Sequence, residues 1–223
     1  MQVNILYRPS QSIAQCWLSA GESVTAESGA MMGMSPNVQM TTQSGGLMSG
    51  LKRLLGGESF FRNTFTAGGG QGEVLFTHAL CGDMATLDVG YTQWLIASSA
   101  YVASSYGVDV ATQSGGFKGF FSRAGLFILG TQGQGQLIVG AFGAVERVAV
   151  NGSLVVDTGH IVAWDSRLQY EVTKATKAGW IASFLSGEGL VAHFEGQGEV
   201  LVQTRNAAEY GSTVGALLPP RSG

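Results

Sequence analysis

Three heptapeptides decide the fold of this chain: Gly70-Gln71-Gly72-Glu73-Val74-Leu75-Phe76, Gly133-Gln134-Gly135-Gln136-Leu137-Ile138-Val139 and Gly196-Gln197-Gly198-Glu199-Val200-Leu201-Val202. Each begins with Gly-Gln-Gly and continues with one polar and three apolar residues. The second begins 63 residues after the first, and the third begins 63 residues after the second. Equal spacing of three matching heptapeptides predicts an internal triplication. We expect each Gly-x-Gly to form a hairpin turn before an apolar strand.

A second landmark recurs in the same order along the chain. Three stretches combine a small-residue bend with the start of an apolar strand: Ser28-Gly29-Ala30-Met31-Met32, Ser98-Ser99-Ala100-Tyr101-Val102 and Thr158-Gly159-His160-Ile161-Val162. The landmarks predict three antiparallel β units and a loosely ordered tail. The units are residues 21–90, 91–152 and 153–210, and the tail is residues 211–223. Because such small units bury too little surface to be stable alone, we expect a single body over residues 1–223 with pseudo-threefold symmetry.

The composition favours strands over helices. Glycine accounts for 34 of the 223 residues and charged residues for 12%, whereas hydrophobic residues reach 45%. Since glycine weakens helices, and since valine, threonine and aromatic residues favour strands, we expect an all-β protein. The formal net charge of -3 gives the chain no general attraction to phosphate, which argues against a nucleic-acid partner.

Two features of the sequence indicate a reducing, cytoplasmic environment. The N-terminus has no basic run followed by an apolar stretch, as a secretory signal would have. The two cysteines, Cys16 and Cys81, form no paired motif, and we expect both as buried, reduced thiols.

Motifs for a cofactor, a metal or catalysis are not found. Gly130-Thr131-Gln132-Gly133-Gln134-Gly135 runs into an apolar strand instead of a helix and lacks the order of a dinucleotide-binding fingerprint. The histidines His78, His160 and His193 are too far apart to form a metal-binding motif. Asp157 and His160 are close in sequence, but no nucleophile is placed beside them, and we predict structural hydrogen bonds for this pair. The sequence therefore predicts no enzymatic activity, no cofactor and no metal.

Each predicted unit carries an apolar step with basic neighbours. The apolar residues fall at i, i+3 and i+4, which places them on one face of a short helical turn. We call the whole set the basic-rimmed surface; it comprises Leu51, Lys52, Arg53, Leu54, Leu55, Phe117, Lys118, Phe120, Phe121, Ile181, Phe184 and Leu185. Three interpretations stay open: these residues cap the core, they mediate self-association, or they dock a protein partner or an anionic membrane.

Several strings resemble one known family. They are Val155-Val156-Asp157-Thr158-Gly159-His160-Ile161-Val162-Ala163-Trp164, Phe194-Glu195-Gly196-Gln197-Gly198-Glu199-Val200-Leu201-Val202-Gln203-Thr204-Arg205, Leu51-Lys52-Arg53 and Phe60-Phe61-Arg62-Asn63-Thr64-Phe65. They are similar to strings of the mitochondrial biogenesis family, which is named for altered inheritance of mitochondria and has many bacterial members. The likeness runs from about Gly21 to Arg205.

The resemblance implies a fold, but it does not imply an activity. It implies three β units in one chain, each like the tryptophan RNA-binding attenuation protein (TRAP-like), of the double-stranded β-helix or sandwich type. Bacterial members of the family resemble proteins of unknown biochemical activity, and eukaryotic members are linked to the organisation of the mitochondrial inner membrane. No catalytic residues come with the resemblance.

The sequence as a whole predicts a non-catalytic structural or interaction scaffold that self-associates as a homo-oligomer. The first alternative is a peripheral membrane protein that docks through the basic-rimmed surface. The second alternative is a protein that binds a small ligand or RNA between its β units.

Overall fold

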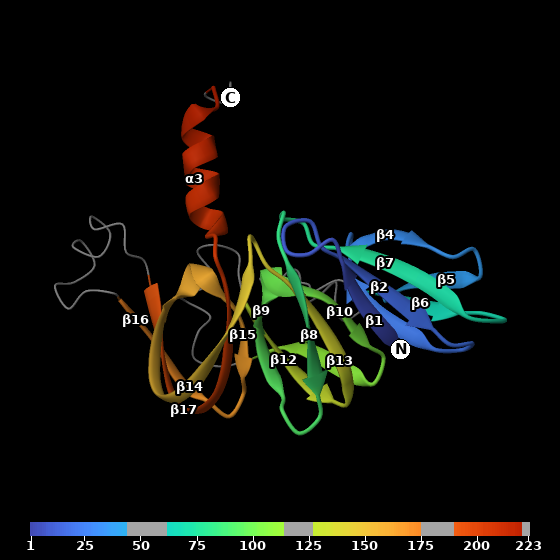
Figure 1. Cartoon of the computed structure of the whole chain (residues 1–223), viewed down its shortest axis with the longest axis horizontal. Coiled ribbons are helices and arrows are strands. Elements are labelled where there is room, and N and C mark those ends of the chain that lie inside the picture. The colour runs from blue at the N-terminus through green and yellow to red at the C-terminus, as the bar shows by residue number, and fades with distance from the viewer. Residues whose placement is uncertain (44–61, 114–126, 175–189, 220–223) are drawn as a thin grey trace, which may run out of the picture.

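The computed structural model describes residues 1–43, 62–113, 127–174 and 190–219, and its fold is nearly all β, built from antiparallel sheets (Figure 1). The first sheet has four strands in the order β1 (Gln2–Leu6), β2 (Ile13–Leu18), β7 (Gly72–Thr77) and β4 (Met31–Met34). The prediction of a β protein from glycine and β-branched residues is therefore confirmed.

The other two sheets are larger. The six-stranded sheet has the order β5 (Val38–Gln43), β6 (Arg62–Ala67), β3 (Ser23–Glu27), β10 (Tyr101–Ser105), β13 (Gly135–Gly140) and β8 (Met84–Val89). The seven-stranded sheet has the order β11 (Val108–Thr112), β12 (Ile128–Gly133), β9 (Trp94–Ala97), β15 (Ile161–Asp165), β17 (Leu190–Gln203) and β14 (Val145–Asp157), and its seventh strand, β16 (Gln169–Lys174), also pairs with β17.

The predicted small-residue bends lie between strands. η1 (Ser98–Ala100) is a short 3-10 turn that connects β9 to β10, and η3 (Thr158–His160) connects β14 to β15. Residues 28–30 connect β3 to β4 in the same way, as a turn. In chain order, the first two bends connect strands of different sheets, and the third connects two strands that both pair with β17.

Two of the three glycine motifs form corners between sheets, the third lies within a continuous strand, and the prediction of hairpin turns is wrong. β6 and β7 flank Gly70 but belong to different sheets, and so do β12 and β13 around Gly133. Gly133 has a φ of 101°, and a Cβ there would lie 2.2 Å from the carbonyl oxygen of Gly107. Around Gly196 the strand β17 is not interrupted. The conformational freedom of glycine allows either a hairpin turn or a corner between sheets, and the pairing of strands far apart in the sequence decides which one forms.

Alternating side chains build three apolar clusters. In β2 and β7 every second residue is buried, and Phe76 packs edge-on against Phe65 with ring centroids 5.3 Å apart. This cluster joins the four-stranded to the six-stranded sheet, and a second cluster, around Tyr101, joins the six-stranded to the seven-stranded sheet. The third lies within the seven-stranded sheet, where the ring of Trp164 meets that of Phe194 at 5.7 Å. Period-two burial therefore holds the sheets together.

The helix α3 (Ala207–Leu217) corrects the predicted loose tail. The Asn206 side chain caps it, because its Oδ1 accepts hydrogen bonds from the next backbone N–H groups at 2.9 and 3.3 Å. Tyr210 packs edge-on against Phe142 with ring centroids 5.3 Å apart. The cap and this contact stabilise a helix in a segment whose glycines lower its helix propensity. No helix in the described part of the chain is long and apolar enough to cross a membrane.

Candidate functional site

The basic-rimmed surface lies outside the described residues. All twelve of its residues fall within 44–61, 114–126 and 175–189. The strands on either side of each segment are described, and each time they pair with one another: Gln43 is opposite Arg62, Thr112 is opposite Leu129, and Lys174 is opposite Leu190. The three segments therefore occupy the same place, each between the two strands of a hairpin.

Asp157 and His160 take structural hydrogen bonds, as predicted. The Asp157 carboxylate accepts a hydrogen bond from the backbone N–H of Gly159 at 2.7 Å, and Nδ1 of His160 lies 2.7 Å from the carbonyl oxygen of Gln203. The ring nitrogens of His78 likewise lie within 3.2 and 2.8 Å of two backbone carbonyl oxygens. Among the residues that the structure describes, no three His, Cys, Asp or Glu side chains are grouped to hold a metal ion.

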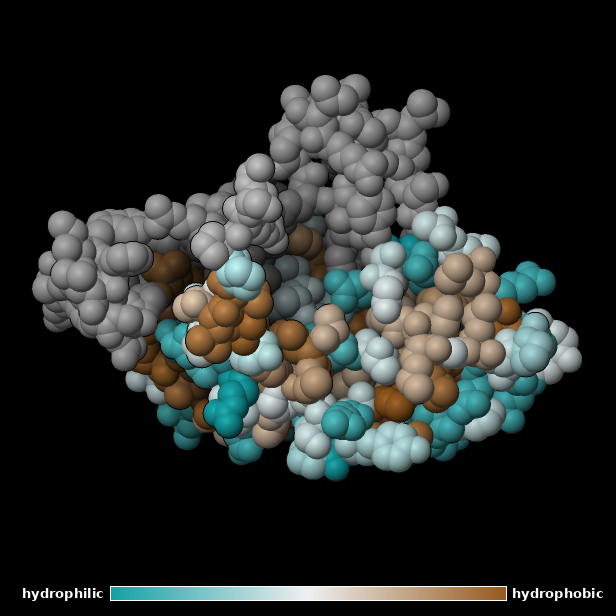
Figure 2. Space-filling model, turned by 90° about the horizontal axis from the view of Figure 1, so that it is seen from above, coloured by the Kyte–Doolittle hydropathy of each residue, from teal (hydrophilic) through white to brown (hydrophobic). Residues whose placement is uncertain are grey.

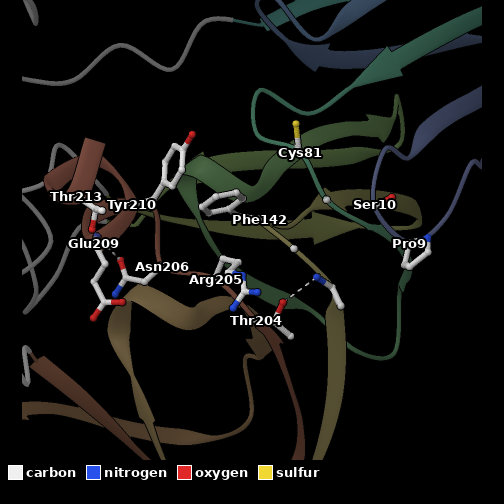
Figure 3. A pocket seen from close by; sticks show the side chains of 13 residues that line it. Pro9, Ser10, Cys81, Phe142, Thr204, Arg205, Asn206, Glu209, Tyr210 and Thr213 are labelled. Atoms are coloured by element: carbon white, nitrogen blue, oxygen red, sulfur yellow. Dashed lines mark hydrogen bonds between the residues drawn. The ribbon is translucent and has the colours of Figure 1, made fainter. Parts of the chain in front are cut away.

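A pocket of about 640 Å³ opens where α3 leaves the sheets (Figure 3). Its wall includes Cys81, Phe142, Arg205 and Tyr210, and Figure 3 shows the Tyr210 ring beside that of Phe142. The thiol of Cys81 is exposed in the turn after β7, so the prediction of two buried thiols is wrong for this residue. Cys16 lies on the inner face of β2, and burial raises the pKa of its thiol to about 12.

Two polar side chains of this pocket bond to the backbone. Thr204 Oγ1 accepts a hydrogen bond from the backbone N–H of Ala144 at 2.9 Å, and Asn206 caps α3. In the described part of the chain, no hydrogen bond joins the Cys81 thiol to a basic side chain. The arrangement offers an aromatic contact surface and lacks the paired nucleophile and base that covalent catalysis needs.

Two buried carboxylates are held by arginine. Asp83 accepts hydrogen bonds from Arg8 Nη2 at 2.7 Å and from the Ser12 hydroxyl at 2.9 Å, and Asp165 accepts one from Arg167 Nε at 3.0 Å. Burial tends to raise the pKa of each carboxyl group, but the arginine hydrogen bonds outweigh burial and keep each pKa below its ordinary value. Both carboxylates therefore stay ionised at neutral pH and serve as structural anchors.

Several strands of the described residues pair on one side only, and two of them lie on opposite sides of the molecule. We name their unpaired sides the β4 edge (Met31–Met34) and the β14 edge (residues 152–157). Within the described residues, β4 pairs with β7 alone, and β14 pairs with β17 alone. Figure 1 shows β14 in the left half of the molecule and β4 in the right half, separated along the long axis. An unpaired edge presents backbone N–H and C=O groups to any strand that approaches it.

The open edges carry exposed apolar side chains. Met32 and Met34 are exposed on the β4 edge, and Val155 is exposed on the β14 edge. Figure 2, which looks at the molecule from above, shows a light brown patch on the right, where β4 is the uppermost labelled strand in Figure 1. Exposed apolar residues along an unpaired edge are typical of an interaction site, and these two edges are the candidate functional site.

Comparison with known proteins identifies the family. The family model of mitochondrial biogenesis AIM24 matches residues 3–205. This chain belongs to the AIM24 family. An uncharacterized protein of Streptococcus pyogenes serotype M6, M6_Spy0233, is 30% identical to it in an alignment of 216 positions that covers 92% of this chain and 86% of that protein. The crystal structure of protein SPYM3_0169 from Streptococcus pyogenes matches it with a TM-score of 0.83 and 25% identity, covering 97% of this chain and 99% of that chain.

The AIM24 assignment confirms the resemblance drawn from the sequence. The match covers both ends of the described β structure, and the similar crystal structure covers nearly the whole AIM24-family chain. The streptococcal relative is itself uncharacterized, so it brings no activity to this chain. The function has to be argued from the residues and edges of the molecule.

Sequence reasoning missed the open edges of this AIM24-family chain. A signal was present, because Met31-Met32-Gly33-Met34 occupies the slot of Tyr101-Val102-Ala103-Ser104 and of Ile161-Val162-Ala163-Trp164. An array of tandem units leaves one side of its first unit and one side of its last unit without a neighbour. If the chain is such an array, the strand in this slot of the first predicted unit lies at an edge.

Proposed function

We propose that this AIM24-family chain is a non-catalytic scaffold of three tandem β units that self-associates as a homo-oligomer in the cytoplasm. The units are residues 21–90, 91–152 and 153–210, joined in one body with a TRAP-like fold. A second copy of the chain is the first partner. The proposal assigns no cofactor and no metal.

The pattern of strand pairing supports three equivalent units. β2 pairs with β7, β8 pairs with β13, and the first half of β14 pairs with the second half of β17. On the other side of the same strands, β4 pairs with β7, β10 with β13, and β15 with β17. Each of these last three pairings is bulged after the first residue, at Met32, Val102 and Val162. A bulge that recurs at aligned residues supports a repeated unit.

The observation that carries self-association is the way in which the proposed units join. β3 of the first unit pairs with β10 of the second at the first joint, and β9 of the second pairs with β15 of the third at the second joint. Both joints are buried, and Ala103 and Ala163, the first paired residue of β10 and of β15, are fully covered. Pairing between edge strands also joins separate protein chains. The same kind of pairing that joins the proposed units within this chain could therefore join two copies of it.

The non-catalytic part of the proposal rests on the engaged polar groups. The side chains of Asp157, His160 and Thr204 bond to backbone groups within the fold. We expect His160→Ala to leave any measured turnover unchanged. A reproducible turnover that His160→Ala or Asp157→Ala abolishes, in a variant that remains folded, would contradict this part.

Light scattering after size-exclusion chromatography tests self-association. The single chain has a mass of 23.2 kDa, and we expect the purified protein to elute with a multiple of that mass. The measurement is repeated at several concentrations, because a true oligomer shifts with mass action. A mass of one chain at every concentration would overturn the proposal.

Docking on an anionic membrane is the second candidate, favoured by the common place of the three segments that carry the basic-rimmed surface. In the sequence, each segment lies between two strands that pair as a hairpin, so the basic residues hold equivalent sequence positions in the proposed units. The test is flotation with phosphatidylserine vesicles, comparing the wild type with a variant in which Lys52, Arg53, Lys118 and Arg123 are changed to Gln. We expect flotation that falls with salt and with the substitutions, and flotation insensitive to both contradicts this candidate.

A further inference from the structure

The two joints share one register. At the first joint the residues of β10 lie opposite those of β3 as Ala103 to Ala26, Ser104 to Thr25 and Ser105 to Val24. At the second joint the residues of β15 lie opposite those of β9 as Ala163 to Ile96, Trp164 to Leu95 and Asp165 to Trp94. Both pairings are antiparallel, and the second follows the first at aligned residues. The same antiparallel strand pairing, in the same register, therefore occurs at both joints.

The open edges are the two halves of a third joint. β4 follows the first small-residue bend, as β10 and β15 follow the other two. The second half of β14 precedes the bend at η3, as β3 and β9 precede the other two bends. In the described residues neither half has the neighbour that its counterparts have. The halves lie apart along the long axis of one molecule (Figure 1), so a second copy has to supply the missing strand.

Apolar side chains on the same two edges are exposed. Met32 is 58% exposed, whereas its counterparts Val102 and Val162 are 1% and 0% exposed. Met34 on the β4 edge and Val155 on the β14 edge are 40% and 54% exposed. The side chain of Met32, exposed where its apolar counterparts are buried at two joints, indicates a neighbour that one chain alone lacks.

We infer that the β14 edge of one copy pairs antiparallel with the β4 edge of the next copy. The register of the joints places Gly33 opposite Val156, Met34 opposite Val155, and Ser35 opposite Leu154. The inference rests on the proposed self-association and names the surfaces that perform it. The strands β16, β17 and β14 of one copy and β4, β7, β2 and β1 of the next then form one continuous sheet.

Such an interface is heterologous, because each copy contributes a different edge. Head-to-tail contacts of this kind close into a ring when the rotation between copies allows it, and otherwise they continue as a filament. The partner that fits both edges is a second copy of this chain, since its strands already match the register and the apolar character of the joints.

Cysteine crosslinking tests the register. In a Cys81→Ser background, Met34→Cys and Val155→Cys are made on separate proteins, mixed in equal amounts and oxidised. We expect a disulfide-linked dimer from the mixture and none from either protein alone, because head-to-tail pairing keeps two identical edges apart. Linked dimers that form as readily from one variant alone would overturn the inference.

A matched control excludes links that arise from exposure alone. Met40 is 45% exposed, close to Met34, but it lies on β5 in another sheet. A mixture of Met40→Cys and Val155→Cys in the same background is expected to give no linked dimer. If light scattering shows an oligomer but the Met34→Cys mixture links no better than this control, the inference fails and self-association stands. If the wild type is a monomer at every concentration, the proposed function fails as well.

A second variant tests the edge without crosslinking. Val155→Lys places a charge on the β14 edge, and charged residues on an edge oppose the approach of another strand. We expect the mass to fall to that of one chain while the circular dichroism spectrum stays unchanged. Tyr106→Lys, at a residue that is 65% exposed in the turn after β10, is expected to keep the oligomer. An unchanged mass for Val155→Lys would overturn the inference.

Discussion

The second joint and the open edges place similar strands in opposite environments. At the joint, Trp164 of β15 lies opposite Leu95 of β9 and is 1% exposed. On the β4 edge, Met34 occupies the aligned position and is 40% exposed, although it is an apolar residue in a bulged strand of the same kind. Two things differ between the positions. β9 pairs with β15, whereas no described strand pairs with that side of β4, and the Trp164 ring packs against Tyr170 and Phe194. Burial at this position therefore depends on the neighbouring elements more than on the local pattern.

The largest expected effect is at the joint. Trp164→Ala removes a ring that packs edge-on against Tyr170 and Phe194 at 5.0 and 5.7 Å, and it leaves a cavity in the third apolar cluster. We expect a loss of about 3–5 kcal/mol in the free energy of unfolding, measured by urea denaturation. Met34→Ala, at the aligned position on the open edge, is expected to cost less than about 0.5 kcal/mol under conditions where the chain is a monomer.

A conservative variant separates packing from hydrogen bonding. The Nε1 atom of Trp164 is buried and has no hydrogen-bond partner among the described residues. Trp164→Phe removes this unsatisfied N–H and keeps an aromatic ring, so its loss should be clearly smaller than that of Trp164→Ala. Equal losses for the two variants would contradict packing as the main contribution.

The second effect compares the glycine of a corner, Gly133, with its counterpart in a continuous strand, Gly196. Gly133 has a φ of 101°, and a Cβ there would lie 2.2 Å from a backbone oxygen. Gly196 has a φ of 121°, but a Cβ there would meet its nearest neighbour, Leu168, at 3.6 Å. We expect Gly133→Ala to cost about 3 kcal/mol, from both the strained φ and the clash, and Gly196→Ala to cost about 1 kcal/mol from the φ alone.

Urea denaturation of the two variants, at equal protein concentration, measures this difference. Ser153→Ala, at an exposed position of β14, controls for a small change on a strand surface. If Gly196→Ala lowers the free energy of unfolding as much as Gly133→Ala does, the positive φ alone explains both losses. The close approach of Gly133 to the Gly107 carbonyl oxygen then contributes nothing measurable.

Local patterns predicted the strands well and their partners poorly. The apolar runs after Gly70, Gly133 and Gly196 are strands, because alternating or continuous apolar residues suit a pleated surface. Their Gly-x-Gly stretches are corners or continuous strand, since the partner of each strand lies far away in the sequence. The helix α3 was missed because a cap at Asn206 and a contact with Phe142 outweigh its glycines.

The candidate site was beyond prediction for a related reason. The sequence shows that Met32 and Val102 share a slot, but it does not show which of them has a neighbouring strand. Exposure of Cys81 is another property set by the turn in which it lies. Tertiary context decides each of these cases, because the same local pattern is compatible with both environments.

The third effect is a pH dependence at the first joint. Glu27 ends β3, and burial raises the pKa of its carboxyl group from 4.5 to about 7. Since the pKa is higher in the folded chain, this group stabilises the fold fully below about pH 4.5, and the contribution is lost as the pH rises to about 7. We expect Glu27→Gln to melt a few degrees above the wild type at pH 8, with the difference shrinking towards pH 5.

Thermal melting at a series of pH values measures this effect. Glu146→Gln, at an exposed position of β14, is the matched control and should follow the wild type throughout. A pH profile of Glu27→Gln parallel to that of the wild type would show that Glu27 is not responsible for the dependence. The result would then weaken the view that the first joint is a dry, desolvated contact.

The smallest expected effect on stability comes from truncating Met32, and it gives the most direct comparison of the open β4 edge with the first joint. Met32→Ala and Val102→Ala truncate aligned bulge residues, one exposed on the β4 edge and one buried at the first joint. In a monomer, Met32→Ala should change the free energy of unfolding by less than about 0.5 kcal/mol, whereas Val102→Ala should cost more. Where copies associate, Met32 becomes buried, and Met32→Ala should raise the concentration needed for assembly. If Met32→Ala weakens assembly without changing the free energy of unfolding, the residues that contact Met32 lie on another copy. If it weakens assembly and folding equally, those residues lie within the same chain.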